Sequence, residues 1–229
     1  MKRIKIYGFL FIVLFILQIL PIFIYEFYGT IPHGILSEDG YYEYLASICC
    51  FFGFLLFFYT YLKFNKKNYY PLLFSILLFI LFAEEISWGQ RIFDIATPEH
   101  LVELNYQQEI NIHNLKLIQS SNNSTSDIAF KIVVLFLVVF PFFNLIAKVK
   151  YFIYKYNIPI ASIYISLIII VLRFTNKFNY EYIYGSLEHV DKYSLGEAYE
   201  GNIEILLFIL AIEYYFTVKN KILKNGHKI

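Results

Sequence analysis

Charged residues are scarce in this chain of 229 residues, where Asp, Glu, Lys and Arg make up only 16%, against roughly a quarter in a typical soluble protein. The formal net charge is +1, so no overall field argues for a nucleic-acid partner. Cysteine is also rare, and Cys49 and Cys50 are adjacent in an apolar run. Neighbouring cysteines rarely pair, so the sequence predicts no disulfide framework and treats both as small buried side chains.

The chain also lacks the segments of about ten residues with alternating polarity that build a membrane β-barrel. Apolar residues instead make up 59% of it and fall into continuous blocks. A spanning helix needs about 20 mostly apolar residues, and six blocks meet or approach that length: 6–25, 41–62, 70–90, 128–147, 158–174 and 203–218. The sequence therefore predicts an all-α, polytopic membrane helix bundle that forms one integral domain over residues 1–229, with outer loops 26–40, 91–127 and 175–202.

The first block resembles a signal peptide, because Lys2, Arg3 and Lys5 precede its apolar core. That core is long, however, and no small-x-small cleavage site follows it. We therefore expect a retained first helix.

Basic residues alternate along the chain and predict its orientation. Segments rich in lysine precede the first span, follow the second, follow the fourth and end the chain. By the positive-inside rule these segments are cytoplasmic, which places both termini inside and the protein in the cell inner (plasma) membrane. All acidic side chains except Glu213 lie on the opposite, outer side.

The outer end of the second span carries the first acidic cluster. Glu38 and Asp39 suit the positive end of a helix dipole, so capping explains them adequately. Glu43 lies one turn deeper, on the same helix face as Asp39.

A second cluster continues the third span, in the run AEEISWGQR from Ala83 to Arg91. If the helix continued unbroken, Glu84, Ser87, Trp88 and Arg91 would share one face. Adjacent carboxylates at membrane depth are costly unless they face the bundle interior, a cavity or a partner. The alternative is a helix end in the headgroup region, with the tryptophan as an interfacial anchor.

The third cluster, residues 105–114, has ambiguous periodicity. An extended segment would point Asn105, Gln107, Glu109, Asn111 and His113 one way, whereas a helix would align only the first, third and fifth of these. Re-entry into the membrane also stays open. Glutamate and histidine share a face in both arrangements and could bind a metal or form an acid–base pair, although an ordinary surface loop is the simpler alternative.

The fourth cluster precedes and opens the sixth span. Glu197, Glu200 and Glu204 form one stripe, preceded by His189. Three carboxylates on one stripe repel unless they bind cations, share protons or meet basic groups. An exposed amphipathic turn would also accommodate them.

The four clusters together define a candidate site in one outer vestibule. The candidate catalytic residues are Glu84, Glu85, Glu109 and His113. The candidate polar or substrate-binding residues are Asp39, Glu43, Ser87, Trp88, Gln90, Arg91, Asn105, Gln107, Asn111 and Asn114. The candidate metal ligands are Glu85, His113, His189, Glu200 and Glu204.

The motifs EEISWGQR and NxQxExNxHN, with Glu38-Asp39-Gly40 before Glu43, resemble those of a group of uncharacterised bacterial multi-pass membrane proteins. The resemblance covers most of the chain loosely and EEISWGQ specifically. It implies the same topology and the same choice of residues, and it implies no particular reaction.

Three kinds of function are compatible with these residues. The first is a hydrolase or transferase that acts on a lipid or an envelope glycan, using a divalent metal held by carboxylates with or without histidine. The second is a non-catalytic envelope partner or sensor. The third is a proton- or cation-coupled transporter, although the middles of four predicted spans hold no ionisable group.

Overall fold

The computed structural model describes residues 2–28, 40–64, 68–112, 115–119, 125–183 and 189–226, and all regular secondary structure in these ranges is helical. The six longest helices are α1 (Lys2–Tyr28), α2 (Tyr41–Phe64), α3 (Tyr70–Glu85), α7 (Thr125–Phe143), α9 (Ile163–Ile183) and α10 (His189–Gly226). Shorter helices are η1 (Ser87–Gly89), α4 (Gln90–Phe93), α5 (Glu99–Val102), α6 (Lys116–Gln119) and α8 (Ala147–Tyr156). The predicted all-α class is confirmed.

Three helical segments are long and apolar enough to cross a membrane: Arg3–Tyr28, Tyr41–Phe64 and Gly196–Lys224. Two bent pairs raise the number to five if each pair is one span: Tyr70–Glu85 with Ser87–Phe93, and Lys131–Phe143 with Ala147–Tyr156. The fold therefore fits a membrane protein with three to five candidate spans in the described part of the chain.

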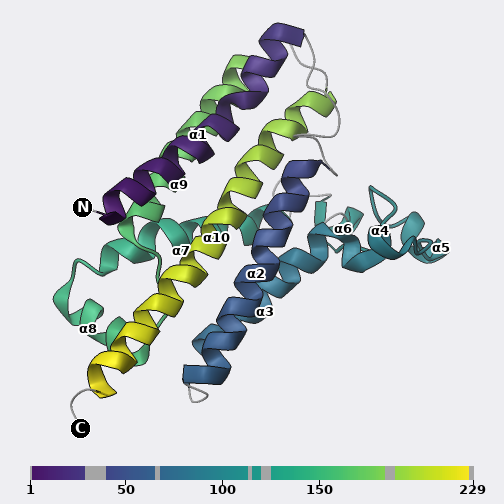
Figure 1. Cartoon of the computed structure of the whole chain (residues 1–229). Helices are drawn as coiled ribbons and strands as arrows, with labels where there is room; N and C mark the ends of the chain where they lie inside the picture. Colours follow the sequence, from purple (N-terminus) through teal and green to yellow (C-terminus); the bar gives the residue numbers. More distant parts are fainter. Residues whose placement is uncertain are drawn as a thin grey trace.

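Helix α10 is the centre of the bundle, with α1 and α9 on one side and α2 and α3 on the other (Figure 1). It packs against α2, α9 and α1. Its inward face is leucine-rich, and Leu206, Leu207 and Leu210 are fully buried. Apolar packing around this one helix therefore fixes how the start of α2, the end of α3 and the first half of α10 meet.

Small residues allow α2 and α10 to approach closely, as is common between membrane helices. A Cβ atom built on Gly201 would lie 2.7 Å from Cε1 of Tyr42 and 3.3 Å from Cβ of Ala46. On the facing helix, a Cβ on Gly53 would lie 3.6 Å from Cα of Phe208 in α10, and 2.7 Å from Cδ1 of Leu78 in α3. Gly201 lies between Glu200 and Glu204 in α10, so this close contact helps to set the position of Glu204.

Four of the predicted segment boundaries need correction. The predicted span 128–147 ends at Phe143, and α8 begins at Ala147 after a bend of 116°. In place of the predicted span 158–174, helix α9 begins at Ile163 and runs to Ile183, so its second half includes polar residues assigned to the outer loop. The outer loop predicted over 175–202 is therefore largely helical, since α10 begins at His189. The break in the third predicted span is described with the site below.

A polar residue of the first apolar block, Gln18, is buried in a network of asparagines. Gln18, fully buried in α1, donates through Nε2 to Oδ1 of Asn176 at 3.2 Å and accepts through Oε1 from Nδ2 of Asn202 at 2.9 Å. Nδ2 of Asn179 donates to the Gln18 carbonyl at 2.7 Å, and the Tyr42 hydroxyl donates to Oδ1 of Asn202 at 2.6 Å. These bonds join α1, α2, α9 and α10, and such bonds are worth about 0.6 kcal/mol each on average in membrane proteins.

Candidate functional site

The third predicted span is interrupted after Glu85, within the run AEEISWGQR. Helix α3 ends at Glu85, and the next helical segment is tilted by 65°. Three consecutive residues adopt positive φ: Ser87 (48°), Trp88 (54°) and Gly89 (85°). The expectation of one continuous helix through residue 90 was wrong, because residues in this left-handed region cannot continue a right-handed helix.

Gly89 has the largest positive φ at this bend, and a Cβ there would lie 3.2 Å from the Phe93 ring. We expect Gly89→Ala to lower the free energy of unfolding by about 1–2 kcal/mol, because alanine pays a cost in this region that glycine does not. Unfolding in mixed detergent micelles measures this. The control is Gly196→Ala, where an added Cβ has nothing within 4 Å; equal effects of the two changes would contradict the prediction.

Residues 105–112 form an irregular loop, neither the helix nor the regular extended segment considered from the sequence. Asn105 and Leu115 close it through an isolated antiparallel bridge, and the amide of Lys116 donates to the carbonyl of Leu104 at 2.8 Å. Gln108 adopts a positive φ of 59° within it. The backbone curls, so the odd-numbered polar side chains turn toward a common centre.

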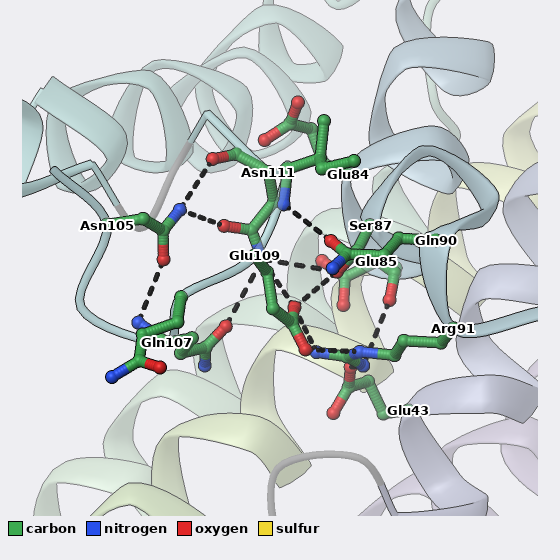
Figure 2. Close-up of polar contacts among 12 residues, drawn as sticks. Glu43, Glu84, Glu85, Ser87, Gln90, Arg91, Asn105, Gln107, Glu109 and Asn111 are labelled. Carbon is green, nitrogen blue, oxygen red and sulfur yellow. Dashed lines mark hydrogen bonds and ion pairs between the residues drawn. The ribbon is translucent and has the colours of Figure 1, made fainter. Parts of the chain in front are cut away.

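Arg91 and Glu109 are that centre (Figure 2). Nε of Arg91 donates to Oε1 of Glu109 at 2.9 Å, and Nη2 donates to Oε2 at 2.8 Å. Both side chains are more than four-fifths buried, with 16% and 17% exposed. A two-point contact of this kind fixes both distance and orientation. It holds the loop against the bend after α3.

Buried polar side chains surround the contact between Arg91 and Glu109. Ser87 donates to Oε2 of Glu109, and Nδ2 of Asn111 donates to the same oxygen at 3.0 Å. Nδ2 of Asn105 donates to the carbonyl and to Oδ1 of Asn111, at 2.9 and 2.8 Å. Asn111 also contacts Oε1 of Gln107 at 3.2 Å. Ser87, Asn105 and Asn111 are at most 2% exposed, so this loop is held by a buried hydrogen-bonded network.

Two more motif side chains bind the loop backbone. Glu84 accepts from Nε1 of Trp88 at 2.6 Å and from the amide of Ile112 at 2.8 Å. Oε1 of Gln90 accepts from the amide of Ile110 at 2.7 Å. These residues therefore position the loop, and both motifs form one structural unit.

Glu43 ties this unit to α2. Its Oε1 lies 3.5 Å from Nη1 of Arg91, and its side chain is 11% exposed. Arg91 therefore contacts acidic residues from two distant parts of the chain, and Figure 2 shows the two carboxylates on either side of its guanidinium.

A second group of carboxylates lies beside the network. Glu85, half-buried at the end of α3, interacts electrostatically with Glu204, Glu43, Glu197 and Glu200. Glu204 is only 8% exposed. The structure thus brings acidic residues of α2, α3 and α10 together, and we name Glu43, Glu85 and Glu204 the carboxylate triad.

Two further side chains of α2, Ser47 and Cys50, were not among the predicted site residues. Cys50 is fully buried in α2 and is an electrostatic neighbour of Glu204. Ser47 lies on the same face of α2 as Glu43 and Cys50, at i+4 and i−3. Its Oγ is buried and has no hydrogen-bond partner among the described residues. A serine four residues after an acidic helix start is the only sequence signal for it, and it is too common to single out.

The side chains of several predicted site residues are not described by the structure. Asp39, His113 and Asn114 lie outside the described residues, and only the backbone of His189 is described, at the start of α10. In the described part of the chain, no group of three or more His, Cys, Asp or Glu side chains is arranged to hold a metal ion. The predicted metal site with His113 therefore stays a prediction.

Comparison with known proteins finds no matching family model, no matching curated protein and no matching solved structure. The resemblance described from the motifs also stays a prediction. The function is therefore argued from the site alone.

Proposed function

We propose that the chain is a plasma-membrane protein with six spans, both termini in the cytoplasm and the carboxylate triad facing outside. The lysines at and after the end of α2, those of α8 and those at the end of α10 support this orientation, as does the polar first part of α10. The apolar first half of α9 would supply the sixth crossing, beside α1. The polar second half of α9 would then extend beyond the hydrocarbon layer.

Reporter fusions test this topology. A fluorescent protein that folds only in the cytoplasm is expected to be bright when fused after residue 66 or 229, and dark after residue 120 or 186. Alkaline phosphatase, active only outside, is expected to give the reverse pattern. Matching signals at residues 66 and 120 would contradict the third span.

We propose further that the triad performs acid–base chemistry for a hydrolase or transferase that acts on a lipid or envelope-glycan substrate. The observation that carries this proposal is the meeting of Glu43, Glu85 and Glu204 from three helices in a region of low exposure. Neighbouring carboxylates in such an environment cannot all ionise equally, so one can hold a proton while another accepts one. That is the division of labour that general acid–base catalysis requires.

The hydrogen bonds separate positioning residues from reacting ones. Both oxygens of Glu109 are committed to Arg91, and both oxygens of Glu84 accept hydrogen bonds from Trp88 and the Ile112 amide. We therefore assign positioning roles to these two, although the sequence gives them as candidate bases. Glu85 and Glu204 are the proposed acid and base.

The distribution of charge along α10 favours chemistry at one face over passage across the bilayer. From Glu204 the next ionisable residue of α10 is Glu213, about 13.5 Å further along the helix axis. The stretch between them includes three fully buried leucines. A continuous polar path along this helix is therefore interrupted at mid-membrane.

Glutamine substitutions test the proposed chemistry, because they keep side-chain shape and remove the titrating group. Extracts of cells that lack the native gene and express wild-type, Glu85→Gln or Glu204→Gln protein would be compared by mass spectrometry of lipids and lipid-linked glycans. We expect a species formed or consumed with wild-type protein, at a rate at least about 100-fold lower in both variants.

The matched control is Glu103→Gln, an exposed carboxylate in the same outer region, which should behave as wild type. Thermal unfolding of each purified variant separates loss of chemistry from loss of fold. Folded Glu85→Gln and Glu204→Gln proteins with wild-type lipid profiles would reject the acid–base role and favour a non-catalytic partner.

A further inference from the structure

We propose that a cavity at the opposite, lysine-rich end of the bundle binds an anionic phospholipid of the cytoplasmic leaflet. This site shares no residue with the carboxylate triad. It rests on the proposed orientation and is independent of the proposed chemistry.

The cavity lies between the start of α1, helix α8, the start of α9 and the end of α10, and it has a volume of about 1250 Å³. That exceeds the roughly 300–1,000 Å³ of most small-molecule sites. Its walls include Ile6, Phe9, Leu10, Ile209, Ile212 and Phe216. A hollow of this size with apolar walls suits acyl chains better than a soluble metabolite.

Basic groups contribute to the same lining. Arg3 reaches it from α1 and Lys150 from α8, and both are exposed. A lipid phosphodiester carries one negative charge, and cations at the cytoplasmic surface attract such headgroups. The combination of two cations with apolar walls therefore matches a headgroup and its chains.

The acidic residue of the lining, Glu213, accepts two hydrogen bonds from the protein itself. Glu213 accepts from the Tyr7 hydroxyl and, through Oε2, from the amide of Ser162 at 3.0 Å. That amide lies at the start of α9, where the helix dipole stabilises negative charge. Glu213 is therefore held by two donors of the protein and does not depend on the basic side chains of the lining.

The orientation of α8 places the cavity at the membrane surface. The chain bends by 116° between α7 and α8, so a helix that follows a spanning segment lies across the end of the bundle. Helix α8 carries Lys148, Lys150 and Lys155 together with aromatic residues, a composition typical of helices in the interfacial region. Headgroups of the inner leaflet therefore lie at the level of the cavity.

Native mass spectrometry of the purified full-length protein tests the proposal, with phosphatidylglycerol and phosphatidylcholine of identical chains as probes. We expect phosphatidylglycerol to bind at least tenfold more tightly. Arg3→Gln and Lys150→Gln should each weaken its binding about fivefold. Lys148→Gln, on the same helix but outside the lining, should leave it unchanged.

A second pair of variants separates binding in the cavity from attraction to the surface. Ile6→Trp adds bulk to an exposed wall residue, whereas Ile4→Trp adds it to an equally exposed residue outside the lining. We expect only the first to weaken both lipids. Equal binding of the two lipids, equal effects of the two tryptophans, or glycerol phosphate binding as tightly as the lipid would overturn the proposal.

Discussion

Arg91→Met is expected to lower the free energy of unfolding by about 3 kcal/mol, since it leaves the buried carboxylates of Glu43 and Glu109 without their cation. The loss should be cooperative, because Ser87 and Asn111 bond to the same Glu109 oxygen. Denaturation by dodecyl sulfate in mixed micelles, followed by circular dichroism, measures it. Limited proteolysis should show new cleavage between residues 105 and 112.

Arg91→Lys keeps the charge but cannot form the two-point contact, so an intermediate loss is expected. The matched control is Lys177→Met, which removes an ion pair with Glu181 whose partners are 70% and 65% exposed. Exposed pairs contribute about 0–1 kcal/mol. The double change Arg91→Met with Glu109→Gln should recover part of the loss; the interpretation fails if Arg91→Met costs no more than Lys177→Met.

Gly201→Val should destabilise the bundle by about 3 kcal/mol, near the upper end of the usual cost of overpacking. Its Cβ alone would lie 2.7 Å from the Tyr42 ring. That ring cannot move freely, because its hydroxyl donates to Asn202 within the buried network. The same unfolding assay measures the stability of the variant.

Gly196→Val is the control, since it introduces the same side chain into the same helix where nothing lies within 4 Å. Only the change in helix propensity remains there, and it should be small. Because Gly201 is three residues from Glu204, its substitution should also reduce the proposed activity. Equal stabilities of the two valine variants would show that α2 and α10 do not depend on this close approach.

The helical class could be predicted from the sequence because it follows from composition, and local pattern singled out several polar residues that the structure brings into contact. Continuous apolar blocks predict helices whatever their partners. Acidic side chains next to such blocks stand out since burial of charge is costly. In this way Arg91, Glu109 and Glu204 were identifiable before their contacts were known.

The bend after α3 could not be predicted, because its cause is tertiary. Ser87 and Trp88 have no intrinsic preference for positive φ; the serine is held there by Glu109 and Asn111, more than 20 residues later. The buried bonds of Gln18 were missed for a similar reason. A single amide in an apolar block carries no local signal of the asparagines that it meets on another helix.

The order of the elements, with α10 made after the motif unit, has a consequence for biosynthesis. Glu43, Arg91 and Glu109 have all left the ribosome long before α10 is made, so the motif unit contains everything that it needs to close early. Glu85 lies at the edge of this unit, and Glu204 is added only when α10 is made. A nascent chain arrested before α10 would thus hold the closed motif unit without Glu204, so the chemistry proposed for Glu85 and Glu204 would require the synthesis of α10.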